Sequence, residues 1–260
     1  MDFLTKLEKL QERNNSLLCV GLDPDSGKLE SGQNQFEFNK KIVDETADYV
    51  CCFKPQIAFY AAVGLIGLEN LKKTIDYIKN RYPKIPVLLD TKRGDVGHTS
   101  EMYAKEVFDF YGADSVTVSP YYGFDSIEPF LKRKNKGVFV ICRTSNPSAT
   151  DFQDLMVGKD PLYLKVAAKI VEWSTKYQNT YLEIGATWPE EIGKLREIAP
   201  KMLFLIAGIG VQGGDLKATL ENGLRYDKKG LIINSSRGII YAQSPKKAAK
   251  NLRDEINRYR

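Results

Sequence analysis

Short apolar runs recur along the whole chain, and many of their residues are β-branched or aromatic. Runs of this length and composition predict buried strands. We expect eight strands, at Ser16–Leu22, Tyr49–Phe53, Pro86–Leu89, Ser115–Ser119, Gly137–Cys142, Thr180–Ile184, Met202–Ala207 and Leu231–Asn234.

The stretches between these runs are amphipathic and long enough to form helices. This alternation predicts a parallel sheet, because consecutive parallel strands need a crossover connection, usually a helix. We expect helices at Phe36–Asp48, Leu68–Arg81, Ser100–Tyr111, Asp125–Leu131, Pro161–Tyr177, Pro189–Ile198, Gly214–Asn222 and Pro245–Arg258. The N-terminal segment is also amphipathic and places four apolar residues on one helical face: Phe3, Leu4, Leu7 and Leu10.

Eight strand–helix units within 260 residues match the size of one α/β barrel, which typically takes about 250 residues. No Pro/Gly/Ser-rich linker divides the sequence. We therefore expect one domain, residues 1–260, with a (β/α)8 TIM barrel fold, in preference to an open doubly wound sheet. In both folds the functional side chains lie at the carboxyl ends of the strands.

The composition, with 43% hydrophobic and 27% charged residues, is typical of a globular protein and excludes disorder of the whole chain. The net charge of +5 is a weak sign of nucleic-acid binding, because the basic residues are dispersed and no aromatic–basic recognition motif accompanies them. No segment approaches roughly 18 consecutive apolar residues, and the N-terminus lacks the apolar core of a signal peptide. We expect a cytoplasmic protein that binds neither membrane nor nucleic acid.

The cysteines lie in apolar runs, without a CxxC pair or a nearby histidine. This arrangement predicts buried reduced thiols and no zinc site. The four residues concerned are Cys19, Cys51, Cys52 and Cys142.

Residues 87–104, VLLDTKRGDVGHTSEMYA, contain a compact array of charges. If the strand continues to Lys92, its period of two points Asp90 and Lys92 to one side and Thr91 to the other. Asp95 follows at the turn into the next predicted helix. The array fits a reactive site, although this stretch alone fits a structural ion-pair cluster equally well.

Charged residues also end the first two predicted strands. Lys54 follows the apolar run Tyr49–Phe53, and Asp23 follows Ser16–Leu22. A lysine at the end of a buried strand is costly unless it is paired or lies at the barrel mouth. We therefore expect Lys54 to meet Asp90 of the neighbouring strand.

The connections after the last two strands have the composition of a phosphate site. The first is glycine-rich, from Gly208 to Gly214, and the second contains Ser235-Ser236-Arg237-Gly238. Glycines let the backbone approach an anion, an arginine adds a charged fork, and such barrels commonly hold phosphate at these loops. Residues 208–213 also match GxGxxG, but only one βα unit follows and no acidic residue closes the next strand, which disfavours dinucleotide binding. We expect a phosphate-ester substrate.

Two predicted connections exceed the usual few residues. The polar stretch Asp23–Gln35 is expected to be an insertion. The stretch Arg143–Asp160 follows a strand end and is a candidate for a lid over the substrate.

These residues, in this order, resemble the orotidine 5′-phosphate decarboxylase family, whose signature is a DxKxxD block. Here the block is Asp90-Thr91-Lys92-Arg93-Gly94-Asp95, and together with RTSNPSA at 143–149 it is similar to the branch with DAKRGD-like sequences. The match extends from Asp23 to Arg237. It implies conversion of orotidine monophosphate (OMP) to UMP, the last step of de novo UMP synthesis, without a metal or another cofactor.

The resemblance also implies roles for the matched residues. Lys54, Asp90 and Lys92 would form a charged network at the reacting carbon, with Lys92 as proton donor. Asp95 would come from the second subunit of a homodimer and complete the catalytic site of its neighbour, with Thr99 beside it. The implied substrate ligands are Asp23 for the ribose, Ser145 for the pyrimidine, and Gln212, Arg237 and the glycine-rich backbone with Gly208, Gly210 and Gly213 for the phosphate.

The implied chemistry needs these charges. Loss of CO₂ from C6 of the orotate ring leaves a carbanion that the ring delocalises poorly, so an ammonium must stabilise it and then supply the proton. Lys92 can do both, while Asp90 crowds the departing carboxylate and holds Lys92. His98 departs from the small residue expected in the family and is interpreted as a surface substitution.

Two other functions stay open at this point. Magnesium-dependent relatives in the same superfamily, the 3-keto-gulonate-6-phosphate decarboxylase and hexulose-phosphate synthase group, share the DxKxxD block but carry a glutamate where this chain has Lys54. A non-catalytic nucleotide-binding barrel would keep the phosphate loops, but it would have no reason to keep the charged residues as well.

Overall fold

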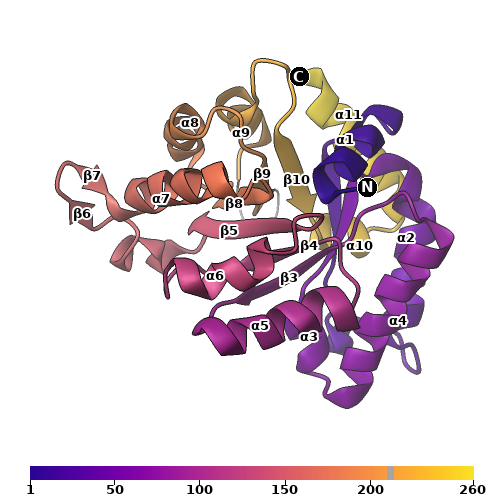
Figure 1. Cartoon of the computed structure of the whole chain (residues 1–260). Helices are drawn as coiled ribbons and strands as arrows, with labels where there is room; N and C mark the ends of the chain where they lie inside the picture. Colours follow the sequence, from indigo (N-terminus) through magenta and orange to yellow (C-terminus); the bar gives the residue numbers. More distant parts are fainter. Residues whose placement is uncertain (210–213) are drawn as a thin grey trace.

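Eight parallel strands form a barrel at the centre of the computed structural model, which describes residues 1–209 and 214–260 (Figure 1). The strands are β1 (Leu18–Leu22), β2 (Cys52–Pro55), β3 (Leu88–Arg93), β4 (Ser115–Val118), β5 (Gly137–Arg143), β8 (Thr180–Gly185), β9 (Phe204–Ala207) and β10 (Leu231–Ser235). They are hydrogen-bonded in the order β2-β1-β10-β9-β8-β5-β4-β3. Two isolated parallel bridges, Phe53–Val87 and Gln56–Asp90, join the β2 and β3 segments, so the predicted TIM barrel is confirmed.

Helices alternate with the strands and surround the barrel (Figure 1). The π-helical turn Glu106–Phe110 continues α5, and two helices, α8 and α11, have the predicted bounds. The helices are α1 (Phe3–Arg13), α2 (Gln35–Thr46), α3 (Ile57–Ala61), α4 (Leu65–Arg81), α5 (Gly97–Lys105), α6 (Phe124–Leu131), α7 (Leu162–Lys176), α8 (Pro189–Ile198), α9 (Leu216–Gly223), α10 (Arg237–Ile240) and α11 (Pro245–Arg258).

The bounds of two strands differ from the prediction in a way that matters for the site. Tyr49 belongs to a 3₁₀ turn, so β2 begins at Cys52 and contains Lys54. β3 continues past Leu89 to Arg93, with a register shift against β4. Hydrophobicity alone did not show these extensions, because strand ends at a barrel mouth remain extended where their residues are polar.

The connection after β5 has a structure of its own, which the sequence pattern did not predict. It contains a 3₁₀ turn, Pro147–Asp151, and a two-stranded antiparallel hairpin of β6 (Met156–Val157) and β7 (Asp160–Pro161). Gly158, in the hairpin turn, has a φ of +70°, which glycine adopts without steric cost. The candidate lid is thus a folded segment.

The N-terminal helix α1 covers the amino ends of the strands. The ring of Phe3 lies 5.8 Å from that of Phe139 and 5.9 Å from that of Tyr181. These three residues belong to the apolar cluster that fills the barrel near the amino ends of its strands. A Cβ on Gly137 would lie 2.4 Å from the Phe3 ring, so only glycine permits this approach. The predicted apolar face of the segment is confirmed at Phe3, Leu7 and Leu10, which are buried.

Both ends of the chain lie near the starts of strands. The backbone N–H of Phe3 donates to the carbonyl of Asn135, just before β5. At the other end, Asn257 and Arg260 donate hydrogen bonds to Asn15, just before β1. The N- and C-termini are therefore at the closed end of the barrel, opposite the mouth.

The four cysteines are buried and free, as predicted. Among the helices of the described residues, none combines the length and the apolar character that crossing a membrane requires.

Candidate active site

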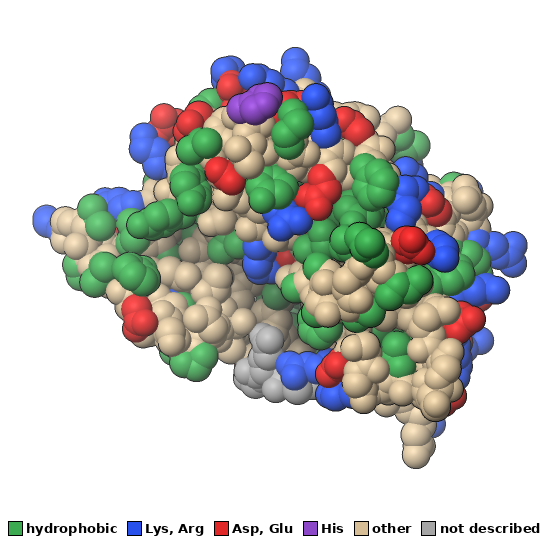
Figure 2. Space-filling model, turned by 90° about the horizontal axis from the view of Figure 1, so that it is seen from below, with side chains coloured by type: hydrophobic (Ala, Val, Ile, Leu, Met, Phe, Trp, Pro, Cys, Tyr) green, Lys and Arg blue, Asp and Glu red, His purple; other side chains and the backbone are tan. Residues whose placement is uncertain are grey.

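A cavity of about 680 Å³ lies at the carboxyl ends of the strands. Figure 2 looks onto this face of the molecule, which is hollowed near its centre. The cavity brings together charged side chains that are far apart in the sequence: Asp23, Lys54, Asp90, Lys92, Arg143, Glu183 and Arg237.

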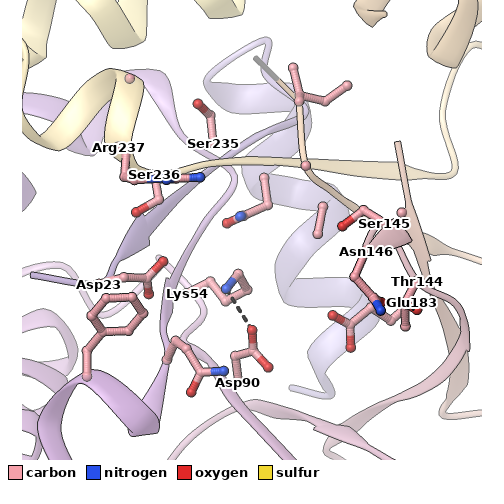
Figure 3. Close-up of a pocket in the computed structure, with 18 of the residues that line it drawn as sticks. Asp23, Lys54, Asp90, Thr144, Ser145, Asn146, Glu183, Ser235, Ser236 and Arg237 are labelled. Atoms are coloured by element: carbon pink, nitrogen blue, oxygen red, sulfur yellow. Dashed lines mark hydrogen bonds and ion pairs between the residues drawn. The ribbon is translucent and has the colours of Figure 1, made fainter. Parts of the chain in front are cut away.

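Asp90 lies between two lysines. Its Oδ2 accepts a hydrogen bond from Lys54 Nζ at 2.9 Å, which Figure 3 marks, and its Oδ1 accepts one from Lys92 Nζ at 2.6 Å. The predicted meeting of Lys54 and Asp90 is confirmed. The side chains of Lys54 and Asp90 are 5% exposed, whereas that of Lys92 is 39% exposed, so Lys92 is the ammonium that faces the open cavity.

The backbone of Lys92 has a left-handed conformation, which affects how its side chain meets Asp90. Lys92 has a φ of +50°, a conformation that costs a non-glycine residue about 1–3 kcal/mol. Asp90 and Lys92 therefore meet as expected, although regular strand alternation is not what brings them together.

Thr117 of β4 supports this backbone. Its Oγ1 accepts hydrogen bonds from the backbone N–H groups of Thr91 at 3.1 Å and Lys92 at 3.0 Å, and donates one to Asp90 Oδ1 at 2.7 Å. Sequence reasoning missed Thr117, because a threonine is an ordinary strand residue and nothing in its spacing distinguishes it.

Opposite charges keep these groups ionised. Burial acts to raise the pKa of Asp90, but Lys54 and Lys92 outweigh it and hold that pKa well below its usual range. Burial acts to lower the pKa of Lys54, but Asp90 and Asp23 raise it above its usual range. Burial also opposes the charge of Lys92, and Glu183 and Asp90 again raise the pKa. At neutral pH two ammonium groups thus flank one carboxylate.

Glu183 of β8 is a second carboxylate beside Lys92 that sequence reasoning missed. Its Oε1 lies 3.1 Å from Lys92 Nζ, and Figure 3 shows Glu183 beside Thr144 and Asn146, to one side of Lys54 and Asp90. The sequence contained one signal: Glu183 is the single charged residue of the predicted strand Thr180–Ile184, and a charge within a buried strand is costly unless it is paired or serves a site.

Asp23 follows β1 and lines the cavity, as expected. Burial raises its pKa, while Lys54 acts to lower it. Its Oδ1 is buried and has no hydrogen-bond partner among the described residues. A carboxylate oxygen in this state is suited to accept a hydrogen bond from a substrate hydroxyl.

The segment after β5 brings Ser145 to the cavity, as expected. Its backbone packs on the end of β8, where a Cβ added to Gly185 would lie 2.5 Å from Ser145 N. The residue before this segment, Arg143, is buried, and its guanidinium bonds Glu191 at 2.5 Å and Asp154 at 3.2 Å. Arg143 therefore connects the first residues of the candidate lid to Glu191 of α8 and to Asp154, which lies farther along the lid.

Gly208 and Arg237 line the same cavity, as expected for a phosphate site. Figure 3 shows Arg237 grouped with Ser235 and Ser236, away from Asp90 and Glu183. Gly208 has a φ of +96°, which favours glycine. The predicted ligands Gly210, Gln212 and Gly213 lie outside the described residues.

Asp95 and Thr99 are not among the described residues that line the cavity. Asp95 precedes α5, where its Oδ1 accepts a hydrogen bond from the Val96 N–H at 2.7 Å, and Thr99 lies in the first turn of α5. His98 is exposed, and it is the purple side chain near the upper edge of Figure 2, away from the hollow.

The arrangement fits a particular kind of chemistry. A half-exposed ammonium held between two carboxylates can stabilise negative charge on a bound molecule and can also deliver a proton. The arginine and the glycine at the other side of the cavity suit an anionic group such as a phosphate.

Comparison with known proteins identifies the family. The sequence model described as "Orotidine 5'-phosphate decarboxylase / HUMPS family" matches residues 16–252. The chain belongs to this family. Curated orotidine 5′-phosphate decarboxylases from Ralstonia nicotianae and Cellvibrio japonicus are 50% and 45% identical to it over 273 and 271 residues, covering 100% and 99% of this chain and 100% and 98% of theirs.

Solved structures agree with this assignment to the decarboxylase family. The structure of Leishmania donovani OMP decarboxylase has a TM-score of 0.91 at 40% identity and covers 100% of this chain and 99% of its own. That of Leishmania donovani UMP synthase has a TM-score of 0.93 at 41% identity and covers 100% of this chain but 56% of its own. The resemblance drawn from the DxKxxD block is confirmed, and the chain is a member of a decarboxylase family of pyrimidine nucleotide biosynthesis.

Proposed function

We propose that this protein decarboxylates OMP to UMP and CO₂, the last step of de novo UMP synthesis. The observation that carries the proposal is the Lys54–Asp90–Lys92 array at the mouth of the barrel, with hydrogen bonds of 2.9 and 2.6 Å. The full-length decarboxylase relatives support it, since they cover the whole chain.

The proposed reaction breaks the bond between C6 of the pyrimidine and its carboxylate carbon. The electron pair remains on C6, CO₂ leaves, and the Lys92 ammonium first stabilises the negative charge and then transfers a proton to C6. Asp90 holds Lys92 on the side of the substrate carboxylate, and Lys54 keeps Asp90 ionised. Asp23 binds the ribose, Ser145 the pyrimidine, and Arg237 the phosphate, together with the glycine-rich segment that begins at Gly208.

We propose that no metal takes part. Lys54 carries a positive charge next to Asp90, and an ammonium at this place opposes the binding of a divalent cation by the same carboxylate. Decarboxylation that persists in excess EDTA supports this statement, and loss of activity that magnesium restores would contradict it.

The first experiment is an absorbance assay of OMP consumption in EDTA, with wild type and Lys92→Ala. We expect turnover by the wild type and a loss of roughly 100- to 10,000-fold in the variant, because a positioned proton donor is removed. Lys217→Ala is the matched control, since Lys217 lies on the exposed face of α9 with a side chain 59% exposed. A folded wild type that leaves OMP unchanged would refute the proposed function.

We further propose a homodimer in which Asp95, with Thr99, completes the site of the partner. Asp95 is absent from the described lining of its own cavity. Hydrophobic side chains gather on the same face of the molecule (Figure 2), and a contiguous exposed apolar surface is typical of an interface. The large hydrophobic side chains exposed on the segments after β2, β3 and β4 are Phe59, Leu65, Ile66, Val96, Met102, Phe110, Tyr121 and Tyr122.

Mixing two inactive variants tests the shared site. Lys92→Ala and Asp95→Asn chains are each expected to be inactive alone. After unfolding and refolding together, half of the dimers are mixed and each has one intact site, so about a quarter of the wild-type activity should return. Light scattering gives the mass of the particle, and a monomer, or a mixture that stays inactive, would contradict the proposal.

The substrate assigned here is a free nucleotide, and we propose that the protein acts in the cytoplasm without a membrane or nucleic-acid partner. Four buried free cysteines are consistent with a reducing compartment.

A further inference from the structure

Glu183 is a buried acid whose place in the site the proposed mechanism does not explain. It is 6% exposed and lies in the middle of β8, between the uncharged Ile141 of β5 and Leu205 of β9 in the barrel register. Its Oε1 is bound to Lys92 at 3.1 Å. Its Oε2 is buried and has no hydrogen-bond partner among the described residues.

Glu183 also stands close to Asp90. Both carboxylates contact the same ammonium, at 3.1 and 2.6 Å, so their nearest oxygens are no farther apart than the sum of these distances. The charged groups on the elements that face Glu183 are Lys54 of β2, Asp90 and Lys92 of β3 and Arg143 of β5. Arg143 already pairs with Glu191 and Asp154, and Arg237 lies with Ser235 and Ser236 away from Asp90 and Glu183. The two lysines therefore remain to balance Asp23, Asp90 and Glu183.

The substrate adds one more negative charge at this point. Its C6 carboxylate must approach Lys92, which holds Asp90 and Glu183 already. An ionised Glu183 would repel that carboxylate, and its unpaired Oε2 would remain buried without a hydrogen bond. Protonation of Glu183 removes one negative charge. It also makes Oε2 a hydrogen-bond donor, from which the substrate carboxylate can accept a hydrogen bond.

We propose that Glu183 takes up a proton from solvent when OMP binds and donates it in a hydrogen bond to the C6 carboxylate, while its Oε1 continues to position Lys92. Burial, followed by Asp90, raises the pKa of Glu183, against the opposite effect of Lys92 and Lys54. The uptake of a proton is therefore less costly here than at an exposed glutamate. This inference deepens the proposed function and rests on it.

The test compares the pH dependence of kcat/KM for OMP in the wild type and Glu183→Gln. The amide keeps an acceptor for Lys92 and always presents a donor at the other position, so it imitates the protonated acid. In the wild type, kcat/KM should fall by up to tenfold per pH unit above the pKa of Glu183 in the free enzyme. Glu183→Gln should lack this fall, so that the ratio of variant to wild type increases with pH.

Two controls separate this role from a structural one. The inhibition constant of UMP, which has the same ribose and phosphate but no C6 carboxylate, should be equal in the wild type and Glu183→Gln at each pH. Glu183→Leu has a similar size but neither donor nor acceptor, and at low pH it should lose tenfold or more in kcat/KM relative to Glu183→Gln.

The outcomes are distinguishable. Parallel pH profiles with a constant ratio between wild type and Glu183→Gln would overturn the proton uptake, and equal activity of the Leu and Gln variants at low pH would overturn the hydrogen bond. A wild type that does not consume OMP at any pH would overturn the proposed function and this inference with it, whereas the first two results leave the proposed function intact.

Discussion

A single hydroxyl group, Thr117 Oγ1, connects β4 to the reactive end of β3. It accepts hydrogen bonds from two consecutive backbone N–H groups and donates to Asp90 at 2.7 Å. One of those N–H groups belongs to Lys92, whose left-handed backbone needs support from its surroundings. The direction of the Lys92 ammonium therefore depends on a residue of the neighbouring strand.

Replacement of Thr117 by valine should lower both stability and turnover. Valine has the same shape but removes the acceptor of two backbone N–H groups and one of the two donors to Asp90 Oδ1, which costs about 1–3 kcal/mol in the free energy of unfolding. We expect kcat to fall more than KM rises, because the position of the proton donor is affected. Urea denaturation and steady-state kinetics measure the two effects.

Thr117→Ser is the matched control, since it keeps the hydroxyl and should keep most of the activity. Equal kcat in the Val and Ser variants would show that the hydroxyl does not position Lys92.

Arg237 acts at the other side of the cavity. If it binds the substrate phosphate, Arg237→Ala should reduce kcat/KM for OMP by roughly 100-fold or more, since a charge-assisted contact is lost. Arg237→Lys keeps the charge but not the bidentate geometry of the guanidinium, so its kcat/KM should lie between those of the wild type and Arg237→Ala. Unchanged kcat/KM in Arg237→Ala would refute the phosphate assignment.

At the scale of elements, the segment after β5 depends on one buried side chain. Arg143 bonds Glu191 of α8 and Asp154 of the segment itself, and Gln153 of the same segment at 3.2 Å. Trp188 lies 5.3 Å from its guanidinium. Ser145 is two residues away, so this cluster sets the position of the proposed pyrimidine ligand.

We expect Arg143→Met to lower the free energy of unfolding by about 1–3 kcal/mol, because two carboxylates lose their partner while remaining partly in contact with water. The KM for OMP should rise, since the segment that contains Ser145 is no longer held. Arg143→Lys, which keeps one charge, should have a smaller effect on both quantities. An unchanged KM for OMP in Arg143→Met would show that the contacts of Arg143 do not influence substrate binding.

The elements themselves were largely predictable from the sequence, whereas the details of the site were not. Hydrophobic periodicity is a property of each segment alone, and it gave α8 and α11 their observed bounds. The meeting of Lys54 and Asp90 followed from parallel strands that end at one edge. Thr117 and Glu183 act through neighbours on other strands, and a single sequence does not contain the register that brings them together.

At the scale of the whole molecule, two buried acids, Asp90 and Glu183, make the free energy of unfolding depend on pH in opposite directions. The pKa of Asp90 is lowered on folding, so its stabilising contribution is present above the unfolded pKa of about 3.9 and is lost as the pH falls below it. The pKa of Glu183 is raised on folding, so the folded protein binds the extra proton and the free energy of unfolding falls as the pH rises above about 4.3.

Comparison of wild type with Glu183→Gln isolates the second effect, because Asp90 is present in both proteins. The variant should gain stability relative to wild type as the pH rises from about 4.3 through the folded pKa of Glu183, and the difference should then become constant. Urea denaturation at a fixed protein concentration measures it. A difference that does not change with pH would show that Glu183 has an ordinary pKa in the folded protein.

The two ends of the chain lie at the closed end of the barrel, near Asn15 and Asn135, while the cavity opens at the other end. A tether attached to either terminus therefore has no need to pass across the mouth. Immobilisation on a support through the N- or C-terminus should leave substrate entry free. The same geometry would let a barrel of this kind be joined end to end with another polypeptide without obstruction of its mouth.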